Sequence, residues 1–591
     1  MLTHSRVVYV PVTKVETVPR HLMTDSLTVA APPPRSEADI VTALSAKDFK
    51  ALHDAIGYVA YSSVLTFKQG MSSLQRDQWK VEMLREMNDF IFKYRTVSGE
   101  WVSKGELPVD AVVCRGIWCL EVKHDGRLRA RLVIDGSNQV ADVEQHESFY
   151  APTPLKRNIR IQYVYAQARD WQTDIFDIEK AFLLSEHTTA AQTRRNMWLQ
   201  CPPGVYPEHT GKYTKVVGTL YGQRSAPSDW YRTLTAYVLA YGGMTRVDQD
   251  PCVFVQRNKR GKIIMLLNVH VDDGAVSGSR KNVDRFLTYL RIKYVIKVQN
   301  GANKRHLGIN VDQVGDTIVL SGRDWLVEQS KTMIHSDTPM WKEPLPPKKL
   351  YPSAAVKSPY QKPYQEVVGK AIYAASHFAP MSLFASSRAS MHNSQGSKEQ
   401  LDLATRIIQF TIQYPMGIVI PRGPVTIWVL IAYSDSDLAC HPKARSTMGG
   451  VILLNGVLID WFSRIQLTVA FSTFEAEYVA LAEVVREVLA VMHFLAYVDI
   501  HISTAVVHCD QQKVVESVYS GQIVNSRQVR HLLIRFEHVV DHISAGRIQV
   551  LWIKSEANCA DPFTKPVCAE ELLKHASTMG LRVLPAGFHK P

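Results

Sequence analysis

The chain has 591 residues, of which 46% are hydrophobic and 21% are charged. This length exceeds what one hydrophobic core supports, so we expect several domains, and the composition excludes a largely disordered chain. Lysine and arginine outnumber aspartate and glutamate by 68 to 56, which gives a formal charge of +12. Such a balance suits a polyanionic partner, although on charge alone a merely basic soluble protein fits equally well.

Cysteine spacing and hydropathy exclude further classes of protein. The cysteines form no CxxC pair and no spacing that would assemble a zinc site, since they stand at positions 114, 119, 201, 252, 440, 509, 559 and 568. No apolar run reaches the roughly 18 residues that a membrane-spanning helix needs, and the first residues lack the apolar core of a signal peptide. We therefore expect a soluble intracellular protein with reduced thiols and no membrane association.

Proline-rich breaks divide the chain. Residues 1–50 show no clear periodicity and contain three successive prolines, so we expect a tail or linker there. A second break spans 339–352, and a third, at 421–424, is predicted to stop a helical stretch. The expected domains are therefore a large block at 51–335, a helical block at 336–424 and a C-terminal α/β block at 425–591.

Two neighbouring carboxylates are expected at the tip of a buried hairpin. Residues 263–269 are almost wholly apolar and predict a buried strand, which HVDDG (270–274) follows. Gly274 would permit a tight turn after Asp272 and Asp273. Taken alone, such an acidic turn is more often a solvated surface feature than a functional site.

A second acid changes that interpretation. Residues 173–178 predict a strand and 179–183 a helical turn, which places Asp177 at the strand end. Nucleotidyl transfer needs two Mg²⁺ ions about 3.5–4 Å apart, so carboxylates must converge on them from different strands. Asp177 and Asp272 would supply that pair.

These segments resemble the reverse transcriptases of copia-type LTR retrotransposons. DIEKAFL (177–183) is similar to the family's first catalytic motif, DVKTAFL, and HVDD (270–273) is similar to its YVDD motif. Five further stretches resemble family motifs in the same order: LRARLVIDG (128–136), ESFYAP (147–152), MWLQCPPG (197–204), LYGQRSAPSDWY (220–231) and RHLGINV (305–311).

The resemblance implies that Asp177, Asp272 and Asp273 bind the catalytic metal ions. Two residues in these motifs depart from the family pattern. His270 replaces the tyrosine of YVDD, and Asp135 replaces an arginine of the fingers motif. Because both acids of HVDD remain, we interpret His270 as a tolerated flanking change. Asp135 weakens the prediction for the fingers more than the prediction for the metal site.

Other matched positions imply a nucleotide site. Phe182 falls where the family has an aromatic gate against the ribose 2′-OH, with a core aromatic as the alternative interpretation. Arg129 and Arg131 match residues that hold the incoming triphosphate, a task suited to fixed cationic donors, with solvated strand residues as the alternative. Tyr221 and Gly222 match the floor of the nucleotide pocket.

The C-terminal block predicts a sheet followed by a long helix. Three antiparallel strands are expected at 429–435, 450–454 and 457–461. Ser472 and Glu475 have the spacing of a capping box ahead of an apolar-periodic helix, so Glu475 is expected to cap it and Glu477 to be the functional acid.

Two more predicted strands, 506–509 and 548–553, precede Asp510 and Asp561. Together with Asp435 and Glu477, these acids stand at element ends in a β-β-β-α-β-α-β-α order, which indicates a two-metal nuclease. Asp437 is the competitor for the role of Asp435.

The same segments resemble the ribonuclease H of copia-type elements, since YSDSDLAC (433–440), STFEAEYVALAE (472–483), VVHCDQQ (506–512) and ADPFTK (560–565) are similar to its motifs. The implied catalytic and metal-binding set is Asp435, Glu477, Asp510 and Asp561. His531 also lies at a family motif, where we expect a structural or nucleic-acid-contacting role.

The resemblance covers about 75–570 and implies an α+β and α/β multidomain fold. Its parts would be a right-hand polymerase with fingers, palm and thumb, a helical connection and an RNase H-like domain. The implied activities are RNA-directed DNA polymerase and ribonuclease H. Each site would use two Mg²⁺ ions, with Mn²⁺ as a substitute.

The implied partners are an RNA template, a DNA primer, an RNA–DNA hybrid and dNTPs, in the cytoplasm, within a virus-like particle, or in the nucleus. A homodimer or an association with integrase is compatible with the resemblance. No segment resembles the protease, integrase or zinc knuckle of the family, so a processed or truncated copy is expected. The alternative function is a decayed or domesticated copy that binds nucleic acid without catalysis, against which the seven retained acids argue.

Overall fold

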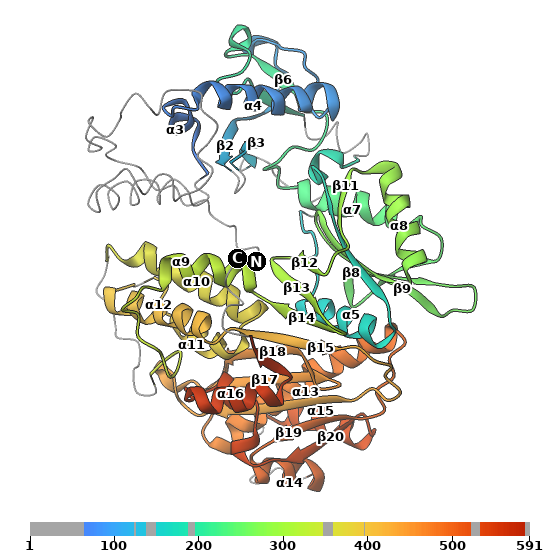
Figure 1. Cartoon of the computed structure of the whole chain (residues 1–591), viewed down its shortest axis with the longest axis vertical. Helices are drawn as coiled ribbons and strands as arrows, with labels where there is room; N and C mark the ends of the chain where they lie inside the picture. The colour runs from blue at the N-terminus through green and yellow to red at the C-terminus, as the bar shows by residue number, and fades with distance from the viewer. Residues whose placement is uncertain are drawn as a thin grey trace. The chain divides into compact units, whose positions relative to one another are not determined.

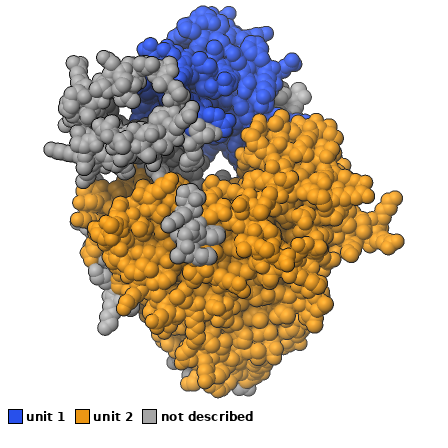
Figure 2. Space-filling model, in the orientation of Figure 1, with its two compact units in different colours: residues 1–151, 180–233 blue, residues 152–179, 234–591 orange. Residues whose placement is uncertain are grey.

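The structure is a computed structural model that describes residues 64–122, 126–136, 149–186, 196–346, 358–394, 396–521 and 532–584. The predicted tail at 1–50, Glu147 of the matched motif and His531 lie outside these residues. The chain has an α+β multidomain fold (Figure 1). It divides into two compact units, residues 1–151 with 180–233 and residues 152–179 with 234–591 (Figure 2). The boundaries predicted at 50, 335 and 424 follow a different division and stay a prediction.

The first unit is built around a β-hairpin covered by a helix. Strand β2 (Gly116–Val122) pairs with β3 (Leu128–Ile134), and alternate β3 side chains enter a core with Trp79 and Met83 of α4 (Arg76–Asn88). The other elements are α3 (Phe67–Met71), η3 (Asp89–Lys93), η4 (Lys104–Glu106), β1 (Val112–Cys114), η6 (Ala181–Leu184), β5 (Met197–Gln200), η7 (Pro207–His209) and β6 (Tyr213–Lys215). Helix α7 (Ala226–Leu239) contains the point of division.

The second unit contains a six-stranded sheet of order β11-β4-β10-β9-β8-β7. Its central strands β9 and β10 are almost entirely buried, as expected for strands that helices cover, and α5 (Lys156–Ala168) and α8 (Arg280–Lys293) pack against the sheet. The strands are β4 (Gln172–Ile178), β7 (Met244–Val247), β8 (Asp250–Arg257), β9 (Ile263–His270), β10 (Asp273–Gly278) and β11 (Ile296–Gln299). The strands predicted at 173–178 and 263–269 are confirmed.

A second sheet joins distant parts of the chain. Its order is β12-β13-β14-β15-β21, with strands β12 (Asn303–His306), β13 (Ile309–Val314), β14 (Thr317–Ser321), β15 (Met416–Pro421) and β21 (Leu581–Val583). Four helices share a separate apolar core: α9 (Arg323–Met333), α10 (Gln361–His377), α11 (Leu383–Ser390), next to η8 (Pro380–Ser382), and α12 (Lys398–Gln413).

The third sheet carries the C-terminal acids. Its order is β18-β17-β16-β19-β20, antiparallel among the first three strands and parallel between β16, β19 and β20. The strands are β16 (Leu430–Asp437), β17 (Thr447–Leu454), β18 (Val457–Ile465), β19 (Ala505–Cys509) and β20 (Ile548–Trp552). Helix α13 (Thr473–Tyr497) packs against β16, β17 and β19 and supplies much of the core. The predicted antiparallel start and long helix are confirmed.

Two details of the predicted order are wrong. Between β19 and β20 the described residues form two helices, α14 (Gln512–Ser520) and α15 (Leu533–Ser544), because each has its own apolar face, with Val518 and Phe536 buried. The break at 421–424 follows a strand and not a helix. Helix α12 already ends at Gln413, since the residue before Pro415 disfavours the helical conformation.

The remaining short elements are η9 (Pro442–Ala444), η11 (Ser555–Ala557), η12 (Asp561–Phe563) and α16 (Ala569–Thr578). Among the described residues, no helix combines the length and the apolar character that crossing a bilayer requires.

Candidate active sites

The first acidic site lies where β4 ends and β9 turns into β10. In the antiparallel ladder Asp273 of β10 stands directly opposite Asp177 of β4 and opposite His270 of β9. Opposed residues in such a ladder point to the same face of the sheet. Asp272 lies in the two-residue turn, where its carbonyl oxygen accepts the Ile178 N–H at 2.6 Å. Three carboxylate residues, from two strands and one turn, therefore lie at the same end of the inner strands of the sheet.

The turn does not use Gly274 as predicted. The left-handed residue is Val271, with φ of 57°, whereas Gly274 lies within β10. A Cβ on Gly274 would lie 2.3 Å from the Phe176 ring, so glycine is required for the close approach of β4 and β10. A β-branched residue with positive φ is unusual and marks a strained turn beside the acids.

The Asp273 carboxylate is half-buried and has one fixed donor, since the Leu307 N–H donates to its Oδ2 at 3.0 Å. Burial raises the pKa of Asp273 to about 7, partly offset by the Leu307 hydrogen bond and reinforced by Asp272 and Asp177. Burial also lowers the pKa of His270, so this histidine is neutral near pH 7 and adds no charge to the site.

The predicted nucleotide-binding residues lie in the first unit. Arg129 and Arg131 alternate with buried residues of β3, so both lie on the hairpin face opposite the core. The Arg131 guanidinium carbon is 5.0 Å from the Tyr221 ring centroid, and the rings of Phe182 and Tyr221 meet edge to face at 6.1 Å. Gly222 has φ of 92°, and its Cβ position lies 2.1 Å from the Ile134 carbonyl oxygen.

Four of the five predicted residues therefore form one cluster. Arg131 and Phe182 both contact Tyr221, and Gly222 follows Tyr221 in the chain. Arg129 lies on the same face of β3 as Arg131. A cation missed by the sequence interpretation, Lys180, lies just before Phe182 and binds Glu86 at 2.8 Å and Asp89 at 2.6 Å. The motif around Phe182 does not predict these ion pairs of Lys180, because both partners lie far away in the sequence, in α4 and η3.

The second acidic site is a tight cluster of four carboxylates from four elements. Asp435 lies in β16, Glu477 in the second turn of α13, Asp510 directly after β19 and Asp561 at the start of η12. Ligand atoms of Asp435, Asp510 and Asp561 all lie within 4.8 Å of one another, as do those of Glu477, Cys509 and Asp510. The four predicted residues are therefore brought together.

Hydrogen bonds from the surrounding elements orient the cluster. The Ser436 N–H donates to Glu477 at 3.1 Å, and the Ser555 hydroxyl donates to Asp510 at 2.6 Å. The Thr564 hydroxyl donates to the Asp435 carboxylate. Asn558, which is fully buried, donates from its amide to the Ser434 carbonyl oxygen at 2.9 Å and so ties the η12 segment to β16.

Asp437 lies outside this cluster. Strand β16 continues to Asp437, which pairs with Thr447 of β17, so Asp435 stands two residues inside the strand and not at its end as predicted. Glu475 is also separate: the Ser472 hydroxyl accepts the Glu475 N–H at 3.2 Å, and the Glu475 carboxylate accepts the Phe471 N–H at 2.8 Å. Glu475 thus has the predicted capping role, with Phe471 in place of Ser472 as the donor.

Burial and mutual repulsion perturb the titration of the cluster. Asp435 is only 2% exposed, and burial followed by the Asp561 charge raises its pKa to about 8. Burial raises the pKa of Glu477 well above its ordinary value, with Asp435 and Asp510 adding to the shift. Burial also raises the pKa of Asp561, an effect that Lys565 opposes. Such crowded, desolvated carboxylates indicate a site that a cation would stabilise.

The donor set fits a hard divalent cation. Glu477 Oε2 and Asp561 Oδ1 are buried oxygens without a hydrogen-bond partner among the described residues, and both residues are only 7% exposed. Carboxylate oxygens are the ligands that Mg²⁺ prefers. Burial raises the pKa of the Cys509 thiol, so it stays protonated and contributes no thiolate. In the described part of the chain, Asp177, Asp272 and Asp273 form no cluster of comparable tightness.

Comparison with known proteins gives a consistent picture. Residues 106–338 match the family described as reverse transcriptase (RNA-dependent DNA polymerase). The Retrovirus-related Pol polyprotein from transposon RE1 of Arabidopsis thaliana is 28% identical over 533 residues, which are 88% of this chain and 35% of that protein. The corresponding protein from transposon TNT 1-94 of Nicotiana tabacum is 25% identical and covers 85% of this chain. The chain spans about a third of the length of these relatives.

Among solved structures, the foamy viral protease-reverse transcriptase in complex with dsDNA is 12% identical, with a TM-score of 0.45 over 80% of this chain and 83% of that one. The predicted resemblance to Pol polyproteins of copia-type elements is confirmed by the family match and by the curated relatives.

Proposed function

As a relative of the copia-type retrotransposon Pol polyproteins, the chain is, we propose, an RNA-directed DNA polymerase that also cleaves the RNA strand of RNA–DNA hybrids. The family match over residues 106–338 carries the polymerase part of this proposal, since that range includes all three acids of the first site. The four-carboxylate cluster carries the ribonuclease H part.

At the first site we assign metal binding to Asp177, Asp272 and Asp273. When bound, paired Mg²⁺ ions would activate the attacking oxygen and stabilise the leaving one. The register of β4 against β10 keeps Asp177 and Asp273 opposed, and the Leu307 N–H fixes the orientation of the Asp273 carboxylate. This side-by-side placement suits residues that must hold a pair of cations.

In the first unit we assign nucleotide contacts to the predicted residues. Arg129 and Arg131 stand on the outer face of the hairpin, where planar guanidinium groups could each donate two hydrogen bonds to a phosphate. Tyr221 supports Arg131, and burial raises the pKa of its phenol to about 12, so it stays neutral. Phe182 meets Tyr221 edge on, a contact that would hold its ring as a gate against a ribose 2′-OH.

At the second site we assign metal binding to Asp435, Glu477, Asp510 and Asp561, the two-metal arrangement of a nuclease. Asp510 belongs to both groups of neighbouring side chains, one with Asp435 and Asp561 and the other with Glu477 and Cys509, and so joins the two halves of the cluster. Hydrogen bonds from Ser436, Ser555 and Thr564 hold three of the carboxylates in fixed orientations before any substrate binds.

The proposed domains follow from these sites. We assign fingers, palm and thumb of a right-hand polymerase to 51–335, a connection to 336–424 and an RNase H-like domain to 425–591. The partners would be an RNA template, a DNA primer, an RNA–DNA hybrid and dNTPs, in keeping with the net charge of +12. A homodimer and an association with integrase remain further proposals.

Incorporation of dNTPs on a primed RNA template with Mg²⁺ tests the proposal. We expect the full chain to extend the primer and Asp272→Asn, which removes a ligand charge with little change in volume, to lose extension. Unchanged far-ultraviolet circular dichroism would show that the variant is folded. Extension that persists in Asp272→Asn would contradict the assignment. Binding of the template without extension by the unsubstituted chain would favour the decayed, nucleic-acid-binding alternative.

A further inference from the structure

A single lysine stands beside the C-terminal acid cluster. Lys565 lies four residues after Asp561, and the Asp561 carbonyl oxygen accepts the N–H groups of Thr564 and Lys565 at 3.0 and 3.2 Å. This compact turn places the two side chains on the same side, as residues four apart in a helix are. Lys565 Nζ lies 2.9 Å from Asp561 Oδ2.

The ion pair leaves half of the Asp561 carboxylate unused. Oδ2 faces the ammonium, whereas Oδ1 is buried and has no hydrogen-bond partner in the part of the chain that the structure describes. Glu477 Oε2, in the other half of the cluster, is likewise buried and unpartnered. The cluster therefore retains two carboxylate oxygens that could bind a cation while Lys565 stays paired with Asp561.

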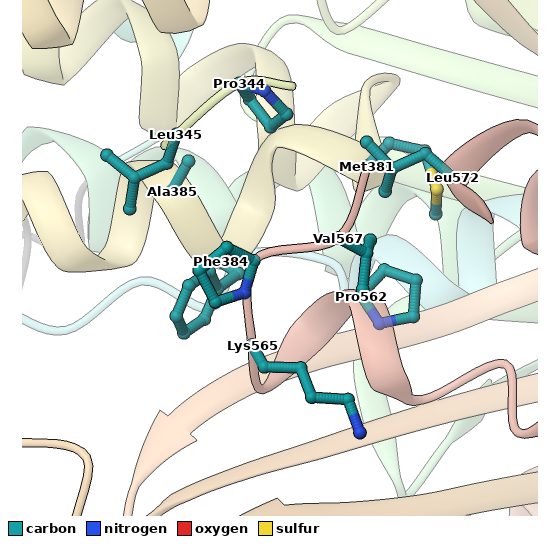
Figure 3. Close-up of a pocket in the computed structure, with 10 residues that line it drawn as sticks. Pro344, Leu345, Met381, Phe384, Ala385, Pro562, Lys565, Val567 and Leu572 are labelled. Atoms are coloured by element: carbon teal, nitrogen blue, oxygen red, sulfur yellow. The ribbon is translucent and has the colours of Figure 1, made fainter. Parts of the chain in front are cut away.

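Packing of its aliphatic stem positions the Lys565 ammonium. The stem lines a small pocket together with Met381 and Phe384 of the helical region and Leu572 of α16. Figure 3 shows the amine end directed away from these apolar side chains. A lysine held in this way buries its methylene groups and presents its charge at a fixed place.

Charge balance singles out this lysine. Within the described ranges, Lys565 is the one lysine or arginine with a nitrogen within 4.0 Å of any of the four carboxylates. The cluster thus combines four acids with one adjacent ammonium, and the ammonium lies on the half formed by Asp435, Asp510 and Asp561. The half that contains Glu477 has no such neighbour among the described residues.

We propose that Lys565 is the resident counter-ion of the acid cluster: it holds Asp561 in place in the metal-free protein and weakens divalent-cation binding at the Asp435–Asp510–Asp561 group. The ligand class, a divalent cation, rests on the nuclease part of the proposed function. Two cations that share one carboxylate repel each other, so the affinity of this half for Mg²⁺ is set partly by the lysine charge. The other half is expected to bind its ion first.

Removal of the lysine charge tests this inference. In the full chain carrying Asp272→Asn, to suppress binding at the first site, we would titrate Mn²⁺ by electron paramagnetic resonance and Mg²⁺ by calorimetry. Lys565→Met keeps the stem in the pocket and should tighten the weaker of the two dissociation constants by about tenfold. Lys565→Arg keeps the charge and should leave that constant within about twofold. Adding Asp510→Asn, which removes the ligand that both halves share, defines the background binding.

A second measurement examines the metal-free state. In EDTA, Lys565→Met should lower the unfolding midpoint of the chain, because the four carboxylates lose the neighbouring positive charge of Lys565, and added Mg²⁺ should raise it more than in the parent. Lys80→Met is the matched control, because it removes a lysine that pairs with Asp77 at 3.2 Å on the exposed face of α4; the midpoint of this variant should respond to Mg²⁺ as the parent does.

The outcomes separate this inference from the nuclease proposal. Equal cation affinity in the parent and in Lys565→Met, with binding abolished by Asp510→Asn, would overturn the counter-ion role and leave the metal site standing. Weaker binding in Lys565→Met would also overturn it, because the lysine would then be organising the ligands and not competing with the ion. Absence of divalent-cation binding in every variant would overturn both.

Discussion

At the scale of single residues, a buried carboxylate is costly unless hydrogen bonds or a cation offset its charge. Asp435 shows this most clearly, since it is almost fully buried, has one hydroxyl donor in Thr564 and lies close to two other acids. A purely structural core does not need such closely spaced carboxylates, because they repel one another. A role in cation binding explains their placement, and substitution of each acid tests that role.

Asp435 and Asp437 provide a direct comparison. Asp435→Asn should abolish cleavage of the RNA strand in a hybrid, because it removes a ligand from the centre of the cluster. Asp437→Asn should retain most of the activity, since Asp437 lies outside the cluster and pairs with Thr447 in the sheet. The measurement is the single-turnover cleavage rate of a labelled hybrid. The reverse order of the two effects would transfer the assignment to Asp437.

The raised pKa values predict how stability varies with pH. Because the folded-state pKa of Asp435, about 8, lies above its ordinary value, the fold favours the protonated acid. The stability that this provides is complete below about pH 4 and is lost as the pH rises to about 8, and Glu477 acts in the same direction. In EDTA, the free energy of unfolding should therefore fall over this range.

Denaturant titrations at several pH values, in EDTA and in Mg²⁺, would check this prediction. Asp435→Asn should flatten the pH dependence in EDTA because the amide does not titrate. In Mg²⁺ the loss toward high pH should shrink, since metal binding strengthens as the ligands deprotonate. A slope in EDTA that Asp435→Asn leaves unchanged would show that other groups dominate.

The sequence located the acids but not their partners. Each acid lies in or next to an element that the sequence predicts, so the approximate positions of Asp177, Asp510 and Asp561 follow from the sequence alone. Thr564 and Lys565 belong to a quoted motif, yet their contacts with Asp435 and Asp561 depend on how η12 folds against β16. Periodicity along the chain carries no such information.

At the scale of elements, the close approach of β4 and β10 constrains the residue at position 274. Gly274→Ala would place a methyl group against the Phe176 ring and should destabilise the fold by about 1–3 kcal/mol. Adding Phe176→Leu should recover part of this loss, because a smaller side chain leaves room for the methyl group. Urea unfolding of the two variants measures both effects.

The coupling between the two substitutions is the decisive quantity. If the losses of Gly274→Ala and Phe176→Leu simply add, the two side chains do not compete for the same space and the contact is not the reason for glycine. This position also shows where sequence reasoning failed. A glycine after two acids suggested a turn residue, whereas the left-handed turn residue is Val271, an assignment that side-chain preferences oppose.

Other elements were predicted well or poorly for identifiable reasons. The apolar runs of β4 and β9 and the capped start of α13 are strong local signals, and each was placed within a few residues. The division between β15 and α12 was missed because Pro415 separates two apolar segments that look continuous by composition. The long β16, which carries Asp437 as well as Asp435, was predicted too short.

At the scale of the whole molecule, the sheet of β12 to β15 and β21 joins residues near 303–321, 416–421 and 581–583. No local sequence pattern predicts strand pairing over such separations. A division of the chain at proline-rich breaks therefore could not predict this sheet. The net charge, in contrast, was available from composition alone.

That charge predicts salt-sensitive binding of nucleic acid. Binding of an RNA–DNA hybrid should weaken steeply between low and moderate salt, because each phosphate contact releases a counterion, with a log–log slope of about −0.9 for each contact. Fluorescence anisotropy at several salt concentrations measures the slope. An affinity that stayed constant over this range would contradict binding through a basic surface.

The proposed function requires two chemically separate sites in this chain. Asp272 lies at the turn between β9 and β10, whereas Asp435 belongs to the sheet of β16, so each substitution should affect only its own activity. The direct test assays primer extension and RNA cleavage together on one labelled RNA–DNA substrate, with Asp272→Asn and Asp435→Asn compared. We predict that Asp272→Asn loses extension and keeps cleavage, while Asp435→Asn loses cleavage and keeps extension. Simultaneous loss of both activities in either folded variant would contradict two independent sites.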